Sequence, residues 1–349
     1  MLHDLPASVG DALQTVHDEL LEVDDGELPD YIPPLAEVDP RQFGLAVCTP
    51  DGGFAAAGDH DVAFTVQSIS KVFTLALALV DRGLDGVLQH VGVEPSGESF
   101  NAVSLEEGTG RPDNPMINAG AIVTCSLVKA DSADARFERI LGVLSACAGR
   151  ELEVDEKVYE EELATADRNR ALAYFMRSAG SMTADVDETL EVYLRQCAVL
   201  VTAGDLAVMA ATLAAGGRNP VNGDRVFSSE VARHVLTIMV TCGMYDASGE
   251  WMLRVGSPAK SGVAGGIITA SPAQFGLGLY SPLLDEKGNS VRSVQACERL
   301  ADRFSWHALA LPEDRRLPAA LEEGDAEATD DDEADESGAV DTGSIDTSA

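Results

Sequence analysis

Apolar and polar residues follow helix-like or strand-like periodicities along most of the chain. Segment 5–22 carries apolar residues three and four positions apart, and this spacing predicts an amphipathic helix. The stretch "FGLAVCTPDGGFAAAGD" holds two short apolar runs around a DGG turn, a pattern typical of a β-hairpin. The run "FTVQSISKVFTLALALV" predicts a buried helix that begins near Ser68.

The middle of the chain is predominantly helical in pattern. In "VTAGDLAVMAATLAAGG", Thr202 is the expected N-cap, Asp205 stands three residues later, and Gly216 is the expected stop. Four other stretches predict helices: "DNPMINAGAIVTCSLV", "TADRNRALAYFMRSAG", "DVDETLEVYLRQCAVL" and "SSEVARHVLTIMVTCGMY".

The pattern changes again near the end of the chain. "GVAGGIITAS" and "QFGLGLYSP" are rich in glycine, β-branched and other apolar residues, and we expect them to form paired strands. "VRSVQACERLADRF" predicts a closing helix. Strands at both ends and helices between them predict an α+β fold, in which one antiparallel sheet with flanking helices packs beside a helical lobe.

We expect one catalytic domain over residues 1–316. Its sheet lobe would comprise 1–67 and 225–310, and its helical lobe 68–224, with a cleft between the lobes as the natural place for a site. Residues 317–349 are acidic and nearly free of aromatic side chains, so they predict a disordered tail.

Charge and cysteine usage narrow the possible partners. The formal net charge is −35, and a surface this acidic repels nucleic acid and anionic membranes, so neither is an expected partner. Lysine is scarce and aspartate abundant, which is typical of proteins from a high-salt cytoplasm; good solubility alone is the other interpretation.

No targeting or metal-binding pattern is evident in the sequence. The six cysteines form no C-x-x-C pair and lie in apolar runs, as expected for reduced residues of a cytoplasmic protein. The six histidines show no ligand spacing. We therefore expect no metal, no cofactor, no secretion signal and no membrane span.

Ser68 and Lys71 stand three residues apart at the start of the apolar run. On a helix, these positions are neighbours on one face. A serine hydroxyl becomes a useful nucleophile when a base takes its proton, and a lysine can be that base when burial and the helix dipole lower its pKa. A chance S-x-x-K, with a capping serine and a lysine that reaches solvent, is the alternative interpretation. Ser70, two residues after Ser68, is a second candidate for the nucleophile.

A second motif changes that balance. Lys260-Ser261-Gly262 opens a predicted strand after the helical region. S-x-x-K at a helix start together with K-[ST]-G on a late strand is the paired signature of serine β-lactamases and penicillin-binding proteins. In that arrangement, the strand lies opposite the nucleophile and helps to form the oxyanion hole.

Longer segments of the sequence show which family the chain resembles. Over roughly residues 5–308, the chain resembles the serine-dependent glutaminases, which hydrolyse L-glutamine to L-glutamate and ammonia. Seven segments carry the resemblance: "DYIPPLAEVDP", "FTVQSISKVFTLALAL", "RPDNPMINAGAIVT", "TADRNRALAYFMRSAG", "VYLRQCAVLVTAGDLAVMAATLA", "MYDASGEWMLRVGSPAKSGVAGGI" and the strand that follows.

The resemblance implies a role for each of several residues. Ser68 would be the nucleophile and Lys71 its base, with Tyr31 and Tyr245 as aids to proton transfer. The N–H groups of Ser68 and Val263 would form the oxyanion hole, and Lys260, Ser261 and Gly262 would support the site. The expected contacts to L-glutamine are Ser68, Asn118, Glu162, Asn169, Tyr193, Tyr245 and Val263.

These residue types suit the substrate. One carboxylate is needed for the α-ammonium group, and Glu162 is the candidate, with Glu160 and Glu161 as neighbours that could take its place. Amide and hydroxyl donors suit the α-carboxylate. The family also implies a homo-oligomer, either a dimer or a tetramer.

Two other functions stay open at this point. A serine β-lactamase-like hydrolase or esterase would open a chromogenic β-lactam or ester and not glutamine. An inactive binding scaffold on the same fold would release no ammonia from glutamine.

Overall fold

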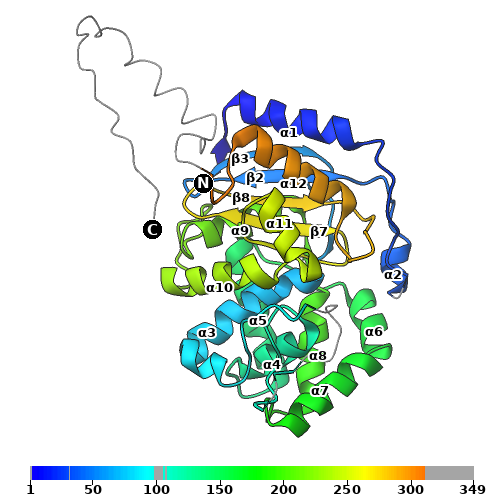
Figure 1. The fold of residues 1–349 in the computed structure, drawn as a ribbon, viewed down its shortest axis with the longest axis vertical. Coiled ribbons are helices and arrows are strands. Elements are labelled where there is room, and N and C mark those ends of the chain that lie inside the picture. Colours follow the sequence, from blue (N-terminus) through cyan, green and yellow to red (C-terminus); the bar gives the residue numbers. More distant parts are fainter. Residues whose placement is uncertain (1, 31, 98–104, 107, 311–349) are drawn as a thin grey trace, which may run out of the picture.

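The computed structural model describes residues 2–30, 32–97, 105–106 and 108–310, and Figure 1 shows their arrangement. The predicted acidic tail, 317–349, lies outside the described residues. A sheet with its covering helices forms one part of the molecule, and a cluster of helices forms the other (Figure 1).

The sheet is six-stranded and antiparallel except at one edge, where β1 runs parallel to β3. The predicted hairpin pairs β2 with β3 in the register Gly44↔Gly58, and the two predicted late strands pair as β7 and β8. In spatial order, the strands are β1 (His3–Asp4), β3 (Gly53–Gly58), β2 (Gly44–Cys48), β8 (Phe275–Tyr280), β7 (Gly266–Ser271) and β6 (Ala259–Ser261).

Helices cover both faces of the sheet. On one face, α1 (Ala7–Leu20) and α12 (Val291–Phe304) bury an apolar core against the strands (Figure 1). On the other face, α9 (Ala203–Ala214) packs against β2, β7 and β8. Gly276 and Gly278 permit this contact, since a Cβ on either glycine would lie 2.1–2.2 Å from the α9 backbone.

The helical part is built around α3 (Ser70–Leu88). This helix is buried along most of its length, as its apolar sequence predicts, and it packs against α4, α5 and α10. The helices of this part are α4 (Asn118–Leu127), α5 (Ala133–Ala148), α6 (Glu156–Ala164), α7 (Asp167–Ala179) and α8 (Val186–Cys197).

Short elements join the two parts. α10 (Ser229–Cys242) packs on α3, and α11 (Ser248–Arg254) follows a 3-10 turn, η2 (Tyr245–Ala247). β4 (Phe64–Thr65) pairs with β5 (Leu200–Val201) in a two-stranded ribbon, and β4 is followed by another 3-10 turn, η1 (Gln67–Ile69). The short helix α2 (Pro33–Ala36) lies beside α6 (Figure 1).

Two local details differ from the sequence expectations. Ser68 lies in the turn η1 and the α-helix begins at Ser70, because Gln67 has a φ of 48° that a regular helix cannot include. The residues of α9 fall within the 68–224 range expected for the helical lobe, yet this helix packs on the sheet. Its capping box of Thr202 and Asp205 forms as the sequence predicts.

Candidate active site

Ser68 lies where the β4 ribbon turns into α3. The N–H of Val66 donates to the carbonyl of Val199 at 2.8 Å, which ties this approach to the segment after α8. The hydroxyl of Ser70 donates to the carbonyl of Gln67 at 2.7 Å and closes the turn. Left-handed backbone at a residue other than glycine is unfavourable and is common at functional sites, so Gln67 marks this turn as a special position.

Lys71 follows Ser68 by three residues and is almost fully buried. Its Nζ donates to Oδ1 of Asn118 at 2.7 Å and to the carbonyl of Met116 at 3.2 Å. No carboxylate among the described residues pairs with it. Burial lowers the pKa of Lys71 to about 8, because the ammonium form loses its hydration and gains no opposite charge.

Asn118, at the start of α4, joins Lys71 to two other predicted residues. The hydroxyl of Tyr193, on α8, donates to Oδ1 of Asn118 at 3.2 Å. The Nδ2 of Asn118 donates to Oδ1 of Asn169, on α7, at 3.3 Å. Three helices thus bring Asn118, Asn169 and Tyr193 into one network that includes Lys71.

Glu162, near the end of α6, reaches the same region through Gln67. The Nε2 of Gln67 donates to Oε1 of Glu162 at 2.6 Å, so the residue before Ser68 holds the carboxylate. Burial raises the pKa of Glu162 to about 7, while the hydrogen bond from Gln67 opposes this shift. Glu160 and Glu161 are exposed, and the structure therefore places Glu162 at the site and its two acidic neighbours in solvent.

Tyr245 approaches Ser68 from the other side, in the turn η2. Its φ is 56°, and its hydroxyl donates to the carbonyl of Ser261 at 3.1 Å. Burial raises the pKa of Tyr245, and a hydrogen bond with Ser68 opposes that shift. Two left-handed residues, Gln67 and Tyr245, therefore flank the Ser68 hydroxyl.

Strand β6 carries the second motif to the same place. Lys260 is fully buried, and its Nζ donates to the carbonyl of Ser261 at 2.7 Å and lies 4.1 Å from the centre of the Tyr245 ring. Burial, and then the nearby charge of Lys71, lower the pKa of Lys260 well below its usual value. At Gly262, a Cβ would lie 3.0 Å from the carbonyl of Val66, so glycine permits the close approach of this segment to the turn at Ser68.

Val263 follows directly and is also buried. The structure thus gathers the predicted residues around Ser68, with the exception of Tyr31, which lies outside the described residues. Sequence reasoning missed Gln67, although its place between the ribbon and Ser68 is visible in "TVQSISK". Within the described ranges, no group of three or more His, Cys, Asp or Glu side chains could hold a metal ion.

Comparison with known proteins connects this geometry to a family. A family model described as Glutaminase matches residues 26–309. A glutaminase of Microcystis aeruginosa is 49% identical over 312 residues, which cover 89% of this chain and 92% of that protein. A glutaminase of Clavibacter michiganensis is 55% identical over 284 residues, which cover 81% of this chain and 87% of that protein.

Comparison with solved structures also finds glutaminases. A crystal structure of Mglu in its glutamate form matches with a TM-score of 0.84 and 49% identity over 89% of this chain and 71% of that one. The probable glutaminase ybaS matches with a TM-score of 0.86 and 39% identity over 88% of this chain and all of that one. These likenesses confirm the predicted α+β, serine β-lactamase-like fold. The chain therefore belongs to the glutaminase family.

Proposed function

We propose that this glutaminase hydrolyses the side-chain amide of L-glutamine through an acyl-enzyme on Ser68, with Lys71 as the base. The observation that carries the proposal is the environment of Lys71, which is buried, has no carboxylate partner in the described part of the chain and donates a hydrogen bond to Asn118. With a pKa of about 8, a fraction of Lys71 on the order of one tenth is neutral at pH 7 and can accept a proton.

In the first step, Oγ of Ser68 attacks the amide carbon and its proton passes to Nζ of Lys71. The developing oxyanion would be held by the N–H groups of Ser68 and Val263, an effect of roughly 3–4 kcal/mol per donor in comparable sites. The C–N bond then breaks, and the proton passes from Lys71 to the departing ammonia. Tyr245 supports this proton transfer because its hydroxyl is hydrogen-bonded to Ser68. Tyr31 is the other residue that could assist the proton transfer.

Water completes the cycle. It gives a proton to Lys71 and attacks the acyl carbon, and the C–O bond to Ser68 breaks to release glutamate. The proton then returns to Oγ of Ser68. Lys260, on the strand opposite α3, supports Tyr245 through the shared carbonyl of Ser261.

The amino-acid part of the substrate would be held by the network on α4, α6, α7 and α8. Glu162 is the carboxylate for the α-ammonium group, and burial without a cationic protein partner among the described residues, which raises its pKa, suits a partner for a positive charge. The amides of Asn118 and Asn169 and the hydroxyl of Tyr193 are donors for the α-carboxylate. A fixed clamp of this kind would favour L-glutamine over D-glutamine and L-asparagine.

The deciding experiment measures ammonia release from L-glutamine, and separately from L-asparagine and D-glutamine, by the wild type and by Ser68→Ala. Ser68→Ala should lose turnover and still bind glutamine in a calorimetric titration. Ser70→Ala tests the neighbouring serine. Its hydroxyl donates to the carbonyl of Gln67 and accepts from Gln196 on α8, so this variant should retain measurable turnover if Ser68 is the nucleophile. Turnover by Ser68→Ala at the wild-type rate would rule out the assigned nucleophile.

We also propose a cytoplasmic homo-oligomer, a dimer or a tetramer, whose acidic surface tolerates molar salt. The charge of −35 supports the salt tolerance, and a crystal structure of the similar protein Mglu was obtained in the presence of 4.3 M NaCl. Within the described residues, no helix is long and apolar enough to cross a membrane. Sedimentation and activity in rising NaCl test this proposal, which fails if activity is lost in molar salt.

A further inference from the structure

A chain of buried polar side chains joins α8 to the turn that carries Ser68. The hydroxyl of Thr74, on α3, donates to Oε1 of Gln196, on α8, at 2.9 Å. The Nε2 of Gln196 donates to Oγ of Ser70 at 3.3 Å, and this hydroxyl donates to the carbonyl of Gln67 at 2.7 Å. Thr74, Gln196 and Ser70 are each at most 1% exposed, so bulk water does not compete for these bonds.

The direction of the Ser70 hydroxyl depends on Gln196. A serine hydroxyl has one hydrogen and can rotate, and at a helix start it can donate to more than one carbonyl of the preceding turn. Because Nε2 of Gln196 donates to Oγ, it occupies an acceptor position of the hydroxyl and leaves the hydrogen to point at the carbonyl of Gln67.

The carbonyl of Gln67 and the N–H of Ser68 are the two ends of one peptide group. A peptide group is planar, so a bond that fixes the carbonyl also fixes the direction of the N–H. Ser68 lies in the first turn of η1, where a helical turn leaves its leading N–H groups unpaired and available to a ligand. A donor to the carbonyl oxygen also polarises the peptide and strengthens its N–H as a donor. The Ser70 hydroxyl therefore acts on a group that is expected to hold the oxyanion.

The same peptide follows the left-handed residue of the site. Gln67 has a φ of 48°, which is unfavourable for a residue other than glycine and persists where the surroundings hold it. Its side chain is held by Glu162, and its carbonyl is held by Ser70. Loss of the second bond would allow the peptide between Gln67 and Ser68 to rotate.

We propose that Gln196 is a positioning residue for the oxyanion hole, and that it acts through the hydroxyl of Ser70 on the peptide between Gln67 and Ser68. Its role needs no contact with the substrate. Because this peptide meets charge that develops only in the transition state, Gln196 contributes to kcat and much less to the binding of glutamine. The inference rests on the proposed function, since it concerns the same Ser68.

The test measures kcat and KM for L-glutamine in Gln196→Met, which keeps the length of the side chain and removes both of its hydrogen-bonding ends. We expect kcat to fall about tenfold or more, while KM and the Kd of L-glutamate, measured by calorimetry, stay within about threefold. Thr74→Val, a milder change at the far end of the chain, should lower kcat about threefold, and it decides the question if Gln196→Met does not fold. An unchanged kcat in the folded variants would overturn the proposal, and so would a rise in KM with kcat retained.

Ser70→Ala breaks the same link from its other side. It should lower kcat about tenfold and leave turnover measurable, and the double variant with Gln196→Met should lose no more than about twofold beyond the larger single loss. Losses that multiply would mean that the two residues act independently, and this result would overturn the proposal.

Thr212→Val is the matched control for Thr74→Val. Thr212 is also buried, and its hydroxyl also contacts one carbonyl of its own helix and one group of another helix, the carbonyl of Cys147. For Thr74, the corresponding contacts are the carbonyl of Ser70 and the amide of Gln196. Thr212→Val should lower the free energy of unfolding about as much as Thr74→Val and leave kcat within about twofold. Equal losses of kcat in the two variants would overturn the positioning role, because they would follow from stability alone.

Ser68→Ala separates this inference from the proposed function. If Ser68→Ala turns over glutamine at the wild-type rate, both are refuted. If Ser68→Ala is inactive and Gln196→Met retains the wild-type kcat, only the role of Gln196 is refuted.

Discussion

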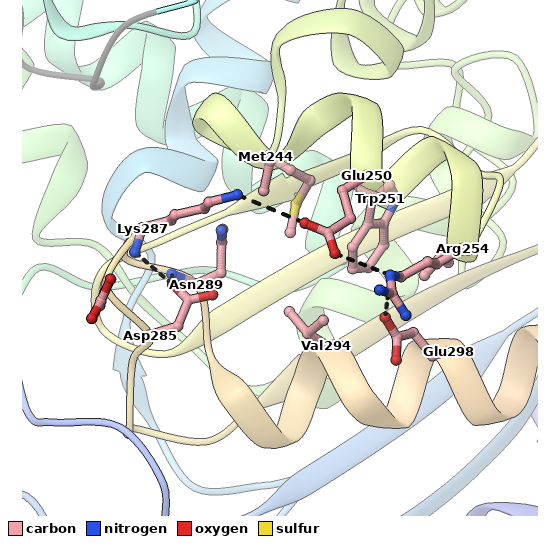
Figure 2. A pocket seen from close by; sticks show the side chains of 12 residues that line it. Met244, Glu250, Trp251, Arg254, Asp285, Lys287, Asn289, Val294 and Glu298 are labelled. Atoms are coloured by element: carbon pink, nitrogen blue, oxygen red, sulfur yellow. Dashed lines mark hydrogen bonds and ion pairs between the residues drawn. The ribbon is translucent and has the colours of Figure 1, made fainter.

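Two lysines show how location decides what a charge can do. Lys71 is buried in a network of amide and hydroxyl groups, and burial lowers its pKa to about 8. Lys287 lies in the segment before α12, with 41% of its side chain exposed, and contacts Glu250 at 3.7 Å (Figure 2). Burial without an opposite charge disfavours the ammonium form of Lys71, whereas Lys287 lies partly in solvent beside a carboxylate.

The same contrast holds for the carboxylates. Burial raises the pKa of Glu162 to about 7, and its partner is the neutral amide of Gln67. The side chain of Glu250 is half exposed and forms ion pairs with both Arg254 and Lys287. The first arrangement leaves a carboxylate available for a cationic substrate group, and the second already satisfies its carboxylate.

Lys71→Met should produce the largest effect. Without a base, the hydroxyl of Ser68 keeps its proton, and we expect kcat/KM for glutamine to fall by about 10³-fold or more. Lys287→Met is the control for a lysine removed from the surface, and it should leave kcat/KM within about twofold of the wild type. Comparable losses in the two variants would contradict the distinction between them.

Glu162→Gln should act mainly on substrate binding. Loss of a buried partner for a charged group costs about 2–5 kcal/mol, so we expect KM for glutamine to rise by about 100-fold, with a smaller change in kcat. Glu161→Gln, one residue earlier and exposed, should behave like the wild type. A large rise in KM for Glu161→Gln would place the substrate carboxylate on the exposed side of α6 and refute the assignment of Glu162.

The pH dependence should follow both shifted groups. Lys71 acts as a base when neutral, so kcat should fall as pH decreases through about 8, by about 80-fold between pH 8.5 and pH 6. Protonation of Glu162 below about pH 7 removes the partner of the α-ammonium group, so kcat/KM should fall more steeply than kcat there. The check is a pH–rate profile, and in Glu162→Gln the steeper acid limb of kcat/KM should become shallower. A profile that is flat between pH 6 and pH 8.5 would show that neither group titrates in this range.

The smallest effect is expected from the ion pairs of Glu250 with Arg254 and Lys287. Glu250→Gln removes half-exposed pairs, so the free energy of unfolding should change by less than about 1 kcal/mol. Asp81→Asn sharpens this comparison, because the side chain of Asp81 is 9% exposed and accepts from both terminal nitrogens of Arg139 and from the N–H of Lys129. Urea unfolding should show a clearly larger loss in the free energy of unfolding for Asp81→Asn than for Glu250→Gln. The reverse order would mean that burial does not decide how much each ion pair stabilises the fold.

Much of the fold was readable from periodic segments. The helix at 5–22, the hairpin around Gly52 and the closing helix appear where apolar spacing predicts them, because each element buries one face and the sequence shows that face. The turn at Ser68 was less readable. The left-handed conformation of Gln67 depends on two hydrogen bonds to distant residues. Gln67 donates to Glu162, and the N–H of Val66 donates to the carbonyl of Val199. No local sequence pattern shows these partners.

The site divides in the same way. The S-x-x-K and K-S-G motifs could be recognised because short spacing fixes their local geometry, and the family resemblance supplied the other candidates. The sequence left Glu160, Glu161 and Glu162 as possible carboxylates. Only the orientation of α6 against η1 separates them, by turning one of the three toward Gln67.

By itself, the amino-acid sequence determined the order of elements, the acidic surface and the pairing of a serine with a lysine at the front of an apolar helix. The tertiary structure decided which polar groups lose water together. Lys71, Asn118, Asn169 and Tyr193 come from four helices. The pKa of Lys71 and the hydrogen bonds among these residues depend on burial by neighbours far away in the chain. Desolvation is a property of the packed fold, and for this reason spacing alone could nominate the base but could not show that it is dry.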